Sequence, residues 1–211
     1  MIIVGAGGLA TQLMEDLIEL KWENTVFWTE VETRYPFIAD HFPIISTDQE
    51  VLEHFKNVSP EFILCVGKDK SDGRIKLADR FRALGGIHVS YISPFSKISP
   101  YGTSFGAGTM VLNMVNIEPG VKVGLACLIN KTANIGHGCI IGDHCELGPA
   151  VILTGEVEVG DNSFIGTGAI IHPKIKIGRN VSVSAGAVVT KHIADNAVVF
   201  GVPAQVKYFK K

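Results

Sequence analysis

The feature that most constrains the fold is an internal repeat of six residues in the second half of the chain. Every sixth residue from Phe105 to Val189 is bulky and apolar, without a break. These anchor positions are Phe105, Val111, Ile117, Val123, Ile129, Ile135, Ile141, Leu147, Leu153, Val159, Ile165, Ile171, Ile177, Val183 and Val189. A period of six fits neither an α-helix nor a single amphipathic strand, so this region must form a repeat architecture.

Two further positions follow the same period. Glycine often follows the anchor, and the residue four places after the anchor is small or β-branched. We expect each hexad to supply one short strand and one corner of a three-sided prism, with the anchor inside and the glycine easing the turn. Three hexads make one coil of about 18 residues, and stacked coils bury a continuous apolar column. Cys127, Cys139 and Cys145 fall on the small inward positions and are expected to be packed core thiols.

Residues 1–92 show a different pattern, in which short apolar strands alternate with helices. A glycine turn follows the first strand at 2–4, and leucines at helical spacing follow the turn. Thr47, with Glu50 three residues later, is typical of the capping box that begins a helix. Further strands are expected at 26–28, 62–66 and 87–92. Strands that alternate with helices predict a small parallel α/β sheet of the Rossmann-like kind.

The glycine turn is a candidate binding site. Backbone N–H groups at a helix N-terminus hold a diphosphate well. The run Gly5-Ala6-Gly7-Gly8 departs from the full GxGxxG spacing, because residue 10 is alanine. Diphosphate binding and tight-turn packing are therefore both open interpretations. Glu30, after the second strand, is either an acceptor for ribose hydroxyls or a solvated strand end.

Composition narrows the function classes. Hydrophobic residues make up 46% and charged residues 19%, and the formal net charge is −2. These values argue against disorder and against nucleic-acid binding through bulk charge. No apolar run reaches the ~18 residues of a membrane span, and the start of the chain lacks a basic signal region. The four cysteines include no CxxC pair, so we expect a cytoplasmic protein with reduced thiols.

The order of the two regions resembles the NeuD/PglD-type sugar acetyltransferases of the hexapeptide-repeat superfamily, over essentially the whole chain. The matching stretches are VGAGG at 4–8, CVGKDKSDGR at 65–74, LINKTANIGHGCIIGD at 128–143 and GVPA at 201–204. The resemblance implies that the prism is a left-handed parallel β-helix. The expected segments are a Rossmann-like nucleotide-sugar-binding domain at 1–92, a linker at 93–104, a β-helix acyltransferase domain at 105–200 and a C-terminal tail at 201–211.

The resemblance also implies a function. Acetyl-CoA would donate an acetyl group to the amino group of a nucleotide-linked amino sugar, for surface polysaccharide or glycan synthesis, in a homotrimer without a metal. In the family a histidine of the coil stretch is the general base, and His137 occupies its place, with Asn130 in the same stretch. Substrate binding is expected at Gly5, Gly7, Gly8, Glu30, Gly67 and Arg74. Acetyl-CoA binding is expected at Glu146, Gly201, Pro203 and Ala204.

The chemistry requires such a base, because an amine that attacks a thioester loses a proton as the C–N bond forms. A neutral imidazole, with an ordinary pKa near 6.5, suits that role near neutral pH. The sequence departs from the family pattern at three positions. Gly138 stands where the family has a carboxylate directly after the histidine. Glu146 stands in place of a second histidine, and Leu9 in place of a histidine of the glycine loop. The ring is then oriented by Glu146, by a neighbouring subunit's carboxylate or by a backbone carbonyl. Sialic acid-type O-acetylation and a non-catalytic trimeric scaffold are the alternatives.

Overall fold

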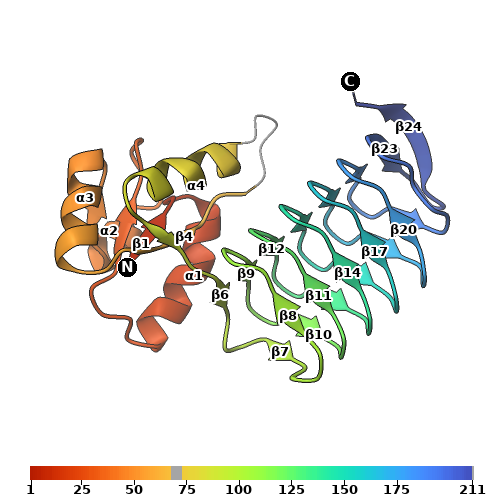
Figure 1. Cartoon of the computed structure of the whole chain (residues 1–211), viewed down its shortest axis with the longest axis horizontal. Coiled ribbons are helices and arrows are strands. Elements are labelled where there is room, and N and C mark those ends of the chain that lie inside the picture. The colour runs from red at the N-terminus through yellow and green to blue at the C-terminus, as the bar shows by residue number, and fades with distance from the viewer. Residues whose placement is uncertain (68–72, 211) are drawn as a thin grey trace. The chain divides into compact units, whose positions relative to one another are not determined.

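The structure, a computed structural model, describes residues 1–67 and 73–210, and it divides the chain into two compact units. Unit 1 comprises Met1–Val89 and unit 2 comprises Ser90–Lys211. Figure 1 shows helices around a short sheet in unit 1 and stacked coils of two-residue strands in unit 2. The boundary between the two units therefore lies close to the point where the alternation of strands and helices gives way to the six-residue repeat.

Unit 1 is built around a five-stranded sheet in which every strand pair is parallel. The strand order is β3-β2-β1-β4-β5. The strands are β1 (Ile2–Val4), β2 (Val26–Trp28), β3 (Ile44–Ile45), β4 (Glu61–Leu64) and β5 (Ile87–His88). The helices are α1 (Gly8–Glu19), α2 (Phe37–His41), α3 (Asp48–Asn57) and α4 (Gly73–Ala83). Parallel strands joined through helices require both faces of the sheet to be covered, which is why β1, β2 and β4 are apolar except for the exposed Glu61 at the start of β4.

One face of this sheet carries an aromatic core. Trp28, Phe62 and Phe81 are buried together with Val51 of α3 and Ala78 of α4. The rings of Trp28 and Phe81 meet edge to face with their centroids 5.1 Å apart. Aromatic pairs in this geometry contribute stabilisation beyond the area they bury. The helices α3 and α4 are therefore attached to the sheet mainly by aromatic packing.

Several elements of unit 1 agree with the sequence prediction, and others differ. The second strand lies at 26–28 as predicted, and the Thr47 side chain accepts a hydrogen bond from the Glu50 backbone N–H in a complete capping box. The third predicted strand begins and ends one or two residues earlier, at 61–64. The predicted strand at 87–92 is wrong as a single element, because it divides into β5 and a second strand that belongs to unit 2. The short elements α2 and β3 were not predicted, since neither spans enough residues to show a period.

Unit 2 consists of coils whose strands stack into three sheets, parallel except for the final β23–β24 pair, which fits a left-handed parallel β-helix. Partners in successive coils are 18 residues apart, as in Ile117 with Ile135 and Val123 with Ile141. We name each sheet after one member. The β13 sheet has the order β22-β19-β16-β13-β10-β7, the β14 sheet β20-β17-β14-β11-β8, and the β15 sheet β24-β23-β21-β18-β15-β12-β9-β6.

The strands of unit 2 follow one another around the three sides of the prism. They are β6 (Tyr91–Ile92), β7 (Lys97–Ile98), β8 (Ser104–Phe105), β9 (Met110–Val111), β10 (Asn116–Ile117), β11 (Lys122–Val123), β12 (Leu128–Ile129), β13 (Asn134–Ile135), β14 (Ile140–Ile141), β15 (Glu146–Leu147), β16 (Ile152–Leu153), β17 (Glu158–Val159), β18 (Phe164–Ile165), β19 (Ile170–Ile171), β20 (Lys176–Ile177), β21 (Ser182–Val183), β22 (Val188–Val189), β23 (Ala197–Phe200) and β24 (Gln205–Phe209). From Val111 to Val189 the anchors are buried in one core cluster, and Phe105 packs against it half-buried. The predicted inward column is confirmed.

The corners turn at a different residue from the one we expected. Every sixth residue from Gly102 to Gly186 has a positive φ, between 49° and 76°, and many of these are not glycine. The glycines directly after the anchors are not among them. A Cβ on Gly136, for example, would come within 2.8 Å of the Thr154 backbone in the next coil. Those glycines therefore allow close approach of neighbouring coils rather than the turn itself.

The repeat extends beyond both predicted ends. The expected linker at 93–104 instead contributes to the first coil, since β6 pairs with β9 and β7 with β10. The inward Ile98 lies seven residues before Phe105 rather than six, so stepping back by six reaches the polar Ser99 and hides the coil. The expected tail at 201–211 contains β24, which pairs antiparallel with β23. Pairing with β23 holds this segment in place, and local sequence patterns do not reveal such a pairing.

Candidate active site

His137 lies at an exposed corner of unit 2, between β13 and β14. Its backbone N–H donates to the Glu118 carboxylate at 2.8 Å, and its carbonyl accepts from the Glu156 N–H at 2.8 Å. Glu118 occupies the corner one coil before, and Glu156 the corner one coil after. The imidazole lies beside Gly155, so close that a Cβ there would meet its Nε2 at 2.5 Å. The corner therefore presents an imidazole to solvent on a backbone held from both neighbouring coils.

Asn130 lies at the other end of β13, at the corner that follows β12. Its side-chain oxygen accepts a hydrogen bond from the Lys131 backbone N–H at 3.0 Å. Asn130 and His137 therefore flank the same strand from opposite corners of one coil. Within one chain the structure does not bring the two side chains together at one corner.

Glu146 begins β15 and belongs to the sheet opposite the corner that carries His137. It is half-buried beside Leu128 and Phe164, its partners in the neighbouring coils. A carboxylate on that face cannot orient the imidazole of the same chain across the filled prism. The carboxylate that does hold the His137 backbone is Glu118, which sequence reasoning missed. The 18-residue coil would have found it, because Glu118 and His137 are 19 residues apart in sequence and fall on stacked corners.

The GVPA motif forms the turn between β23 and β24. The Gly201 carbonyl accepts from the Val188 N–H at 3.1 Å, and the Ala204 N–H donates to the Val188 carbonyl at 2.8 Å. The Val202–Pro203 peptide bond is cis, and Gly201 has a φ of +100°. The motif therefore ties the end of the chain to β22, while Gly201 and Pro203 remain exposed.

The glycine loop of unit 1 joins β1 to α1. Gly5 has a φ of +111°, and a Cβ there would approach the Cys65 carbonyl to 2.7 Å, so this position requires glycine. Gly7 and Gly8 are exposed at the start of α1, which has no side-chain cap. The Tyr35 hydroxyl lies 3.2 Å from the place of a Cβ on Gly8. Tight-turn packing explains Gly5, whereas Gly7 and Gly8 leave backbone N–H groups open to an anion.

Glu30 follows β2 and is engaged by α4. Arg80 pairs with the Glu30 carboxylate and also with Asp48 at 2.7 Å, while its guanidinium lies 5.1 Å from the centroid of the Trp28 ring. The hydrogen bond to Glu30 is the main cause that raises the pKa of Arg80 above its ordinary value. Arg80 was not predicted as a site residue, because its partners lie far from it in sequence.

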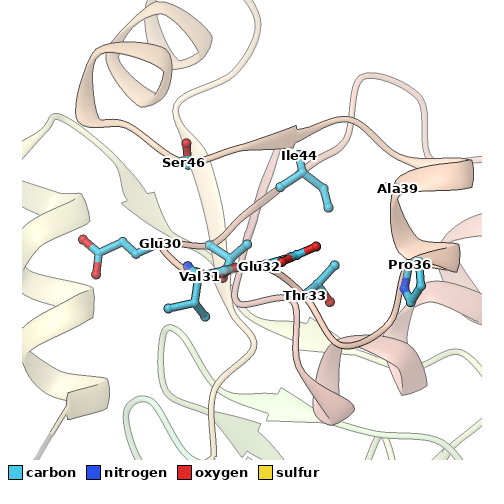
Figure 2. Close-up of a pocket in the computed structure, with 9 residues that line it drawn as sticks. Glu30, Val31, Glu32, Thr33, Pro36, Ala39, Ile44 and Ser46 are labelled. Carbon is cyan, nitrogen blue, oxygen red and sulfur yellow. Dashed lines mark hydrogen bonds between the residues drawn. The ribbon is translucent and has the colours of Figure 1, made fainter.

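A cavity of about 460 Å³ opens beside Glu30 at the carboxyl end of β2. Figure 2 shows Glu30 pointing away from the other lining residues, whereas Glu32 points among them near Ile44 and Thr33. The Thr33 hydroxyl donates to the Ala6 carbonyl at 2.6 Å, which ties the cavity wall to the glycine loop. The full lining comprises Thr29, Glu30, Val31, Glu32, Thr33, Pro36, Ala39, Ile44 and Ser46.

Gly67 lies just before the segment 68–72, and Arg74 follows Gly73 just beyond it. That segment is the half of the CVGKDKSDGR stretch that lies outside the described residues. Gly67 is exposed, and Arg74 is buried in the first turn of α4. The Arg74 charge acts on the nearby Cys65 thiol, yet burial dominates and raises the pKa of Cys65 to about 12. Cys65 is therefore a packed thiol like the three cysteines of unit 2, which are also buried and not in disulfides.

Neither a metal centre nor a membrane span is evident in the described part of the chain. Within residues 1–67 and 73–210, no three His, Cys, Asp or Glu side chains gather as a metal-binding group. Over the same residues, no helix combines the length and apolar character needed to cross a bilayer.

Comparison with known proteins assigns the family. The model of the GMPPB C-terminal domain matches residues 111–206, and no curated protein sequence matches the chain. PerB from Caulobacter crescentus, solved with CoA and GDP-perosamine, is 30% identical, with 98% of this chain and 96% of PerB covered and a TM-score of 0.85. The acetyltransferase domain of PglB from Neisseria gonorrhoeae, solved with acetyl coenzyme A, is 26% identical, with 97% of each chain covered and a TM-score of 0.82.

A third structure, WeeI from Acinetobacter baumannii, shares the fold at 22% identity, with 97% of this chain and 98% of WeeI covered and a TM-score of 0.79. Together with the coils of unit 2, these relatives define a class, the acetyl-CoA-dependent acyltransferases built on hexapeptide repeats. Within that class the chain belongs to the NeuD/PglD-type family of nucleotide-sugar acyltransferases. The resemblance drawn from the sequence is thereby confirmed.

Proposed function

We propose that the chain is an N-acetyltransferase that moves an acetyl group from acetyl-CoA to the amino group of a nucleotide-linked amino sugar. The observation that carries the proposal is the 30% identity to PerB across nearly the whole of both chains. PerB is a perosamine N-acetyltransferase, and its structure holds CoA and GDP-perosamine. The product would serve surface polysaccharide or glycan synthesis. The described cysteines are thiols rather than disulfides, which fits a reducing compartment, so we place the reaction in the cytoplasm.

In the proposed reaction His137 is the general base. The sugar amine attacks the thioester carbonyl carbon, the new C–N bond forms, and the C–S bond breaks to release CoA as its thiolate. The proton lost by the amine passes to the imidazole and then to the thiolate, so charge and atoms balance. His137 suits this role because its ring is exposed at a corner whose backbone is held at both sides. Two solved forms of the perosamine enzyme, each with CoA and GDP-perosamine, carry a replacement of one histidine.

Unit 1 is the proposed nucleotide-sugar-binding domain, and we interpret its doubly wound parallel sheet as Rossmann-like. Ligands of such sheets bind at the carboxyl ends of the strands. The glycine loop and the cavity of about 460 Å³ both lie at that edge, joined by the Thr33 hydrogen bond. The diphosphate would lie against Gly7 and Gly8, and the nucleoside in the cavity. Glu32, rather than Glu30, would accept the nucleoside hydrogen bonds, because Arg80 already holds Glu30.

We further propose that the enzyme is a homotrimer. Asn130, Glu146 and the GVPA turn lie on different corners and sheets of one prism, so one chain does not gather them around His137. A neighbouring copy beside the His137 corner would supply the missing wall of a shared cleft for acetyl-CoA. Light scattering or sedimentation of the purified protein tests this association, and a monomer at assay concentration would contradict it.

The activity is tested by steady-state thiol release with acetyl-CoA and a panel of GDP-, UDP- and dTDP-linked amino sugars. Mass spectrometry of the products identifies the acetylated atom. We expect turnover with at least one amino sugar and none with the matching sugar that carries a hydroxyl in place of the amine. Turnover with hydroxyl acceptors alone would favour O-acetylation, and absence of both turnover and CoA binding would favour a scaffold.

The role of His137 has its own test. His137→Ala should lower kcat by about 10²–10⁴, the usual contribution of a general base. The substitution removes an exposed ring, so the melting curve should be unchanged. His144→Ala, at a half-buried corner that faces a different edge of the prism, is the matched control and should keep near-normal turnover. A loss below about threefold in the His137 variant would reject the base.

A further inference from the structure

The corner that carries His137 stacks on three similar corners. The strands before these corners pair in register, from Asn116 through Asn134 and Ile152 to Ile170. Counting forward from those strands places Pro119, His137, Gly155 and Pro173 at equivalent positions. In this column only Gly155, directly above His137, lacks a side chain. The position next to the histidine is therefore unlike the other members of its column.

The imidazole occupies the space that a side chain at residue 155 would fill. A Cβ built on Gly155 would lie 2.5 Å from Nε2, 2.7 Å from Cε1 and 3.2 Å from Cδ2 of His137. All of these distances are shorter than ordinary van der Waals contact. The ring therefore leans along the prism axis onto the backbone of the next coil, and it can do so only because residue 155 is glycine.

The opposite side of the same corner is held by a charge-assisted hydrogen bond. The Glu118 carboxylate, from the coil before, accepts the His137 backbone N–H at 2.8 Å. Hydrogen bonds to an ionised acceptor are about twice as strong as neutral ones. The residue after the histidine is Gly138, with a φ of +67°, and it offers no side chain for this purpose.

From this geometry we propose that Glu118 and Gly155 are the positioning residues for the base: Glu118 anchors the backbone of His137, and Gly155 leaves the space in which the ring lies. A carboxylate directly after the histidine would orient the imidazole. Here Glu118 from the coil before and Gly155 from the coil after set its position instead. This inference rests on the proposed function, and its tests are chosen so that the two fail separately.

The first test is Gly155→Ala. The three atoms nearest to the new methyl group all belong to the His137 ring, the movable end of a side chain, and the φ of Gly155 is not left-handed. The variant should therefore fold normally while the ring is pushed aside. Misplacement of a catalytic group by about 1 Å costs roughly 10²-fold in rate. We expect kcat to fall about that far, the KM for acetyl-CoA to stay within about threefold, and the imidazole NMR signals of His137 to shift.

The matched control is Gly168→Ala. A Cβ on Gly168 meets no atom within 4 Å, and the equivalent corner one coil earlier already holds an alanine, Ala150, at a φ of 55°. This variant makes the same chemical change at another corner of the same prism. Its kcat and His137 signals should match those of the unchanged protein, while the left-handed φ of +66° at Gly168 should lower its melting temperature slightly. Equal losses in both variants would overturn the proposal, because the effect would then belong to corner glycines in general.

The second test compares Glu118→Ala with Glu118→Gln. Alanine removes the acceptor and leaves the His137 N–H to water, whereas the glutamine amide oxygen still accepts it without charge. We expect kcat to fall about 10-fold or more in the alanine variant and to recover to within about threefold in the glutamine variant, with KM little changed in both. If Glu118 had only a structural role, the alanine variant would have a lower melting temperature, and the two variants would not differ in kcat.

The outcomes separate the two hypotheses. If His137→Ala destroys activity while the Gly155 and Glu118 variants keep normal kcat and normal His137 signals, the base stands and the positioning proposal is wrong. If His137→Ala stays active, the base is wrong, yet shifted His137 signals in Gly155→Ala would still support the geometry. The positioning proposal is also overturned if Gly155→Ala leaves those signals unmoved.

Discussion

The two units bury their apolar residues in different ways. In unit 1, Trp28, Phe62 and Phe81 come from segments far apart in sequence and meet in one aromatic cluster. In unit 2, the buried core cluster contains only aliphatic side chains, alanine and cysteine, stacked in columns at intervals of one coil. Each residue of that core therefore has its neighbours at a fixed distance along the chain. A solenoid core is thus predictable by counting, whereas a folded-sheet core is not.

The same difference applies to the polar groups. In unit 2 the Thr109 hydroxyl, the Cys127 and Cys145 thiols and the Ser163 hydroxyl each donate to a backbone carbonyl fifteen residues ahead. This repeated pattern satisfies carbonyls at one edge of the prism with small inward side chains. In unit 1 the corresponding polar contacts are unique, such as the Thr47 capping box and the Arg80 ion pairs. Site residues on the prism are therefore easier to place than those around the sheet.

The largest effect should come from a charge in the core of the prism. Ile141 is 2% exposed, and Ile141→Asp would bury a carboxylate without a partner. We expect a loss above about 4 kcal/mol and no cooperative melting of unit 2. The control is Ile140→Asp on the same strand, where the side chain is 48% exposed and the change should be nearly neutral. Circular dichroism melts compare the two, and equal curves would contradict the inward assignment of the anchors.

A smaller effect is expected in the aromatic core of unit 1. Phe81 is fully buried against Trp28 and Phe62, and Phe81→Ala should cost about 3–5 kcal/mol through lost contacts and a cavity. Phe37→Ala, with 43% exposure in the same unit, is the matched control and should cost below about 1 kcal/mol. Denaturant unfolding followed by tryptophan fluorescence measures both. Similar midpoints would show that the cluster does not hold unit 1 together.

The smallest effect should come from the capping box of α3. Thr47→Ala removes the cap and should cost about 1 kcal/mol. The pKa of Glu50 is lowered, first by the hydrogen bond from the Ser46 backbone and then by those from Thr47. The stabilisation of the fold by the ionised Glu50 carboxylate is therefore fully present above the ordinary pKa of Glu, near 4.3. It is lost as the pH falls below that value and the carboxylate is protonated. Melts at pH 7 and pH 3 should show the Thr47 effect shrinking in acid; an equal effect at both would contradict this linkage.

Within the candidate site, the limits of sequence reasoning are specific. His137 was proposed from a motif, yet its hydrogen-bond partner Glu118 was missed because that contact crosses from one coil to the next. The glycines that follow the anchors were expected to ease the turn, which was wrong. Only the stacking of the coils shows that a Cβ at Gly136 would clash with the backbone of the next coil. The first coil was missed because Ile98 breaks the six-residue step by one. Each error concerns a relation between segments rather than the identity of a segment.

By itself, the sequence determined the prism, its inward column, the two-region organisation and the family, because these depend on periods and motifs that are local or strictly repeated. Only the tertiary structure decided which carboxylate meets the His137 backbone, that the His137 ring lies over Gly155, and that Arg80 pairs with Glu30. The physical reason is that a period sets which face a side chain takes, whereas a hydrogen bond or a close contact depends on atoms brought within a few ångströms by folding.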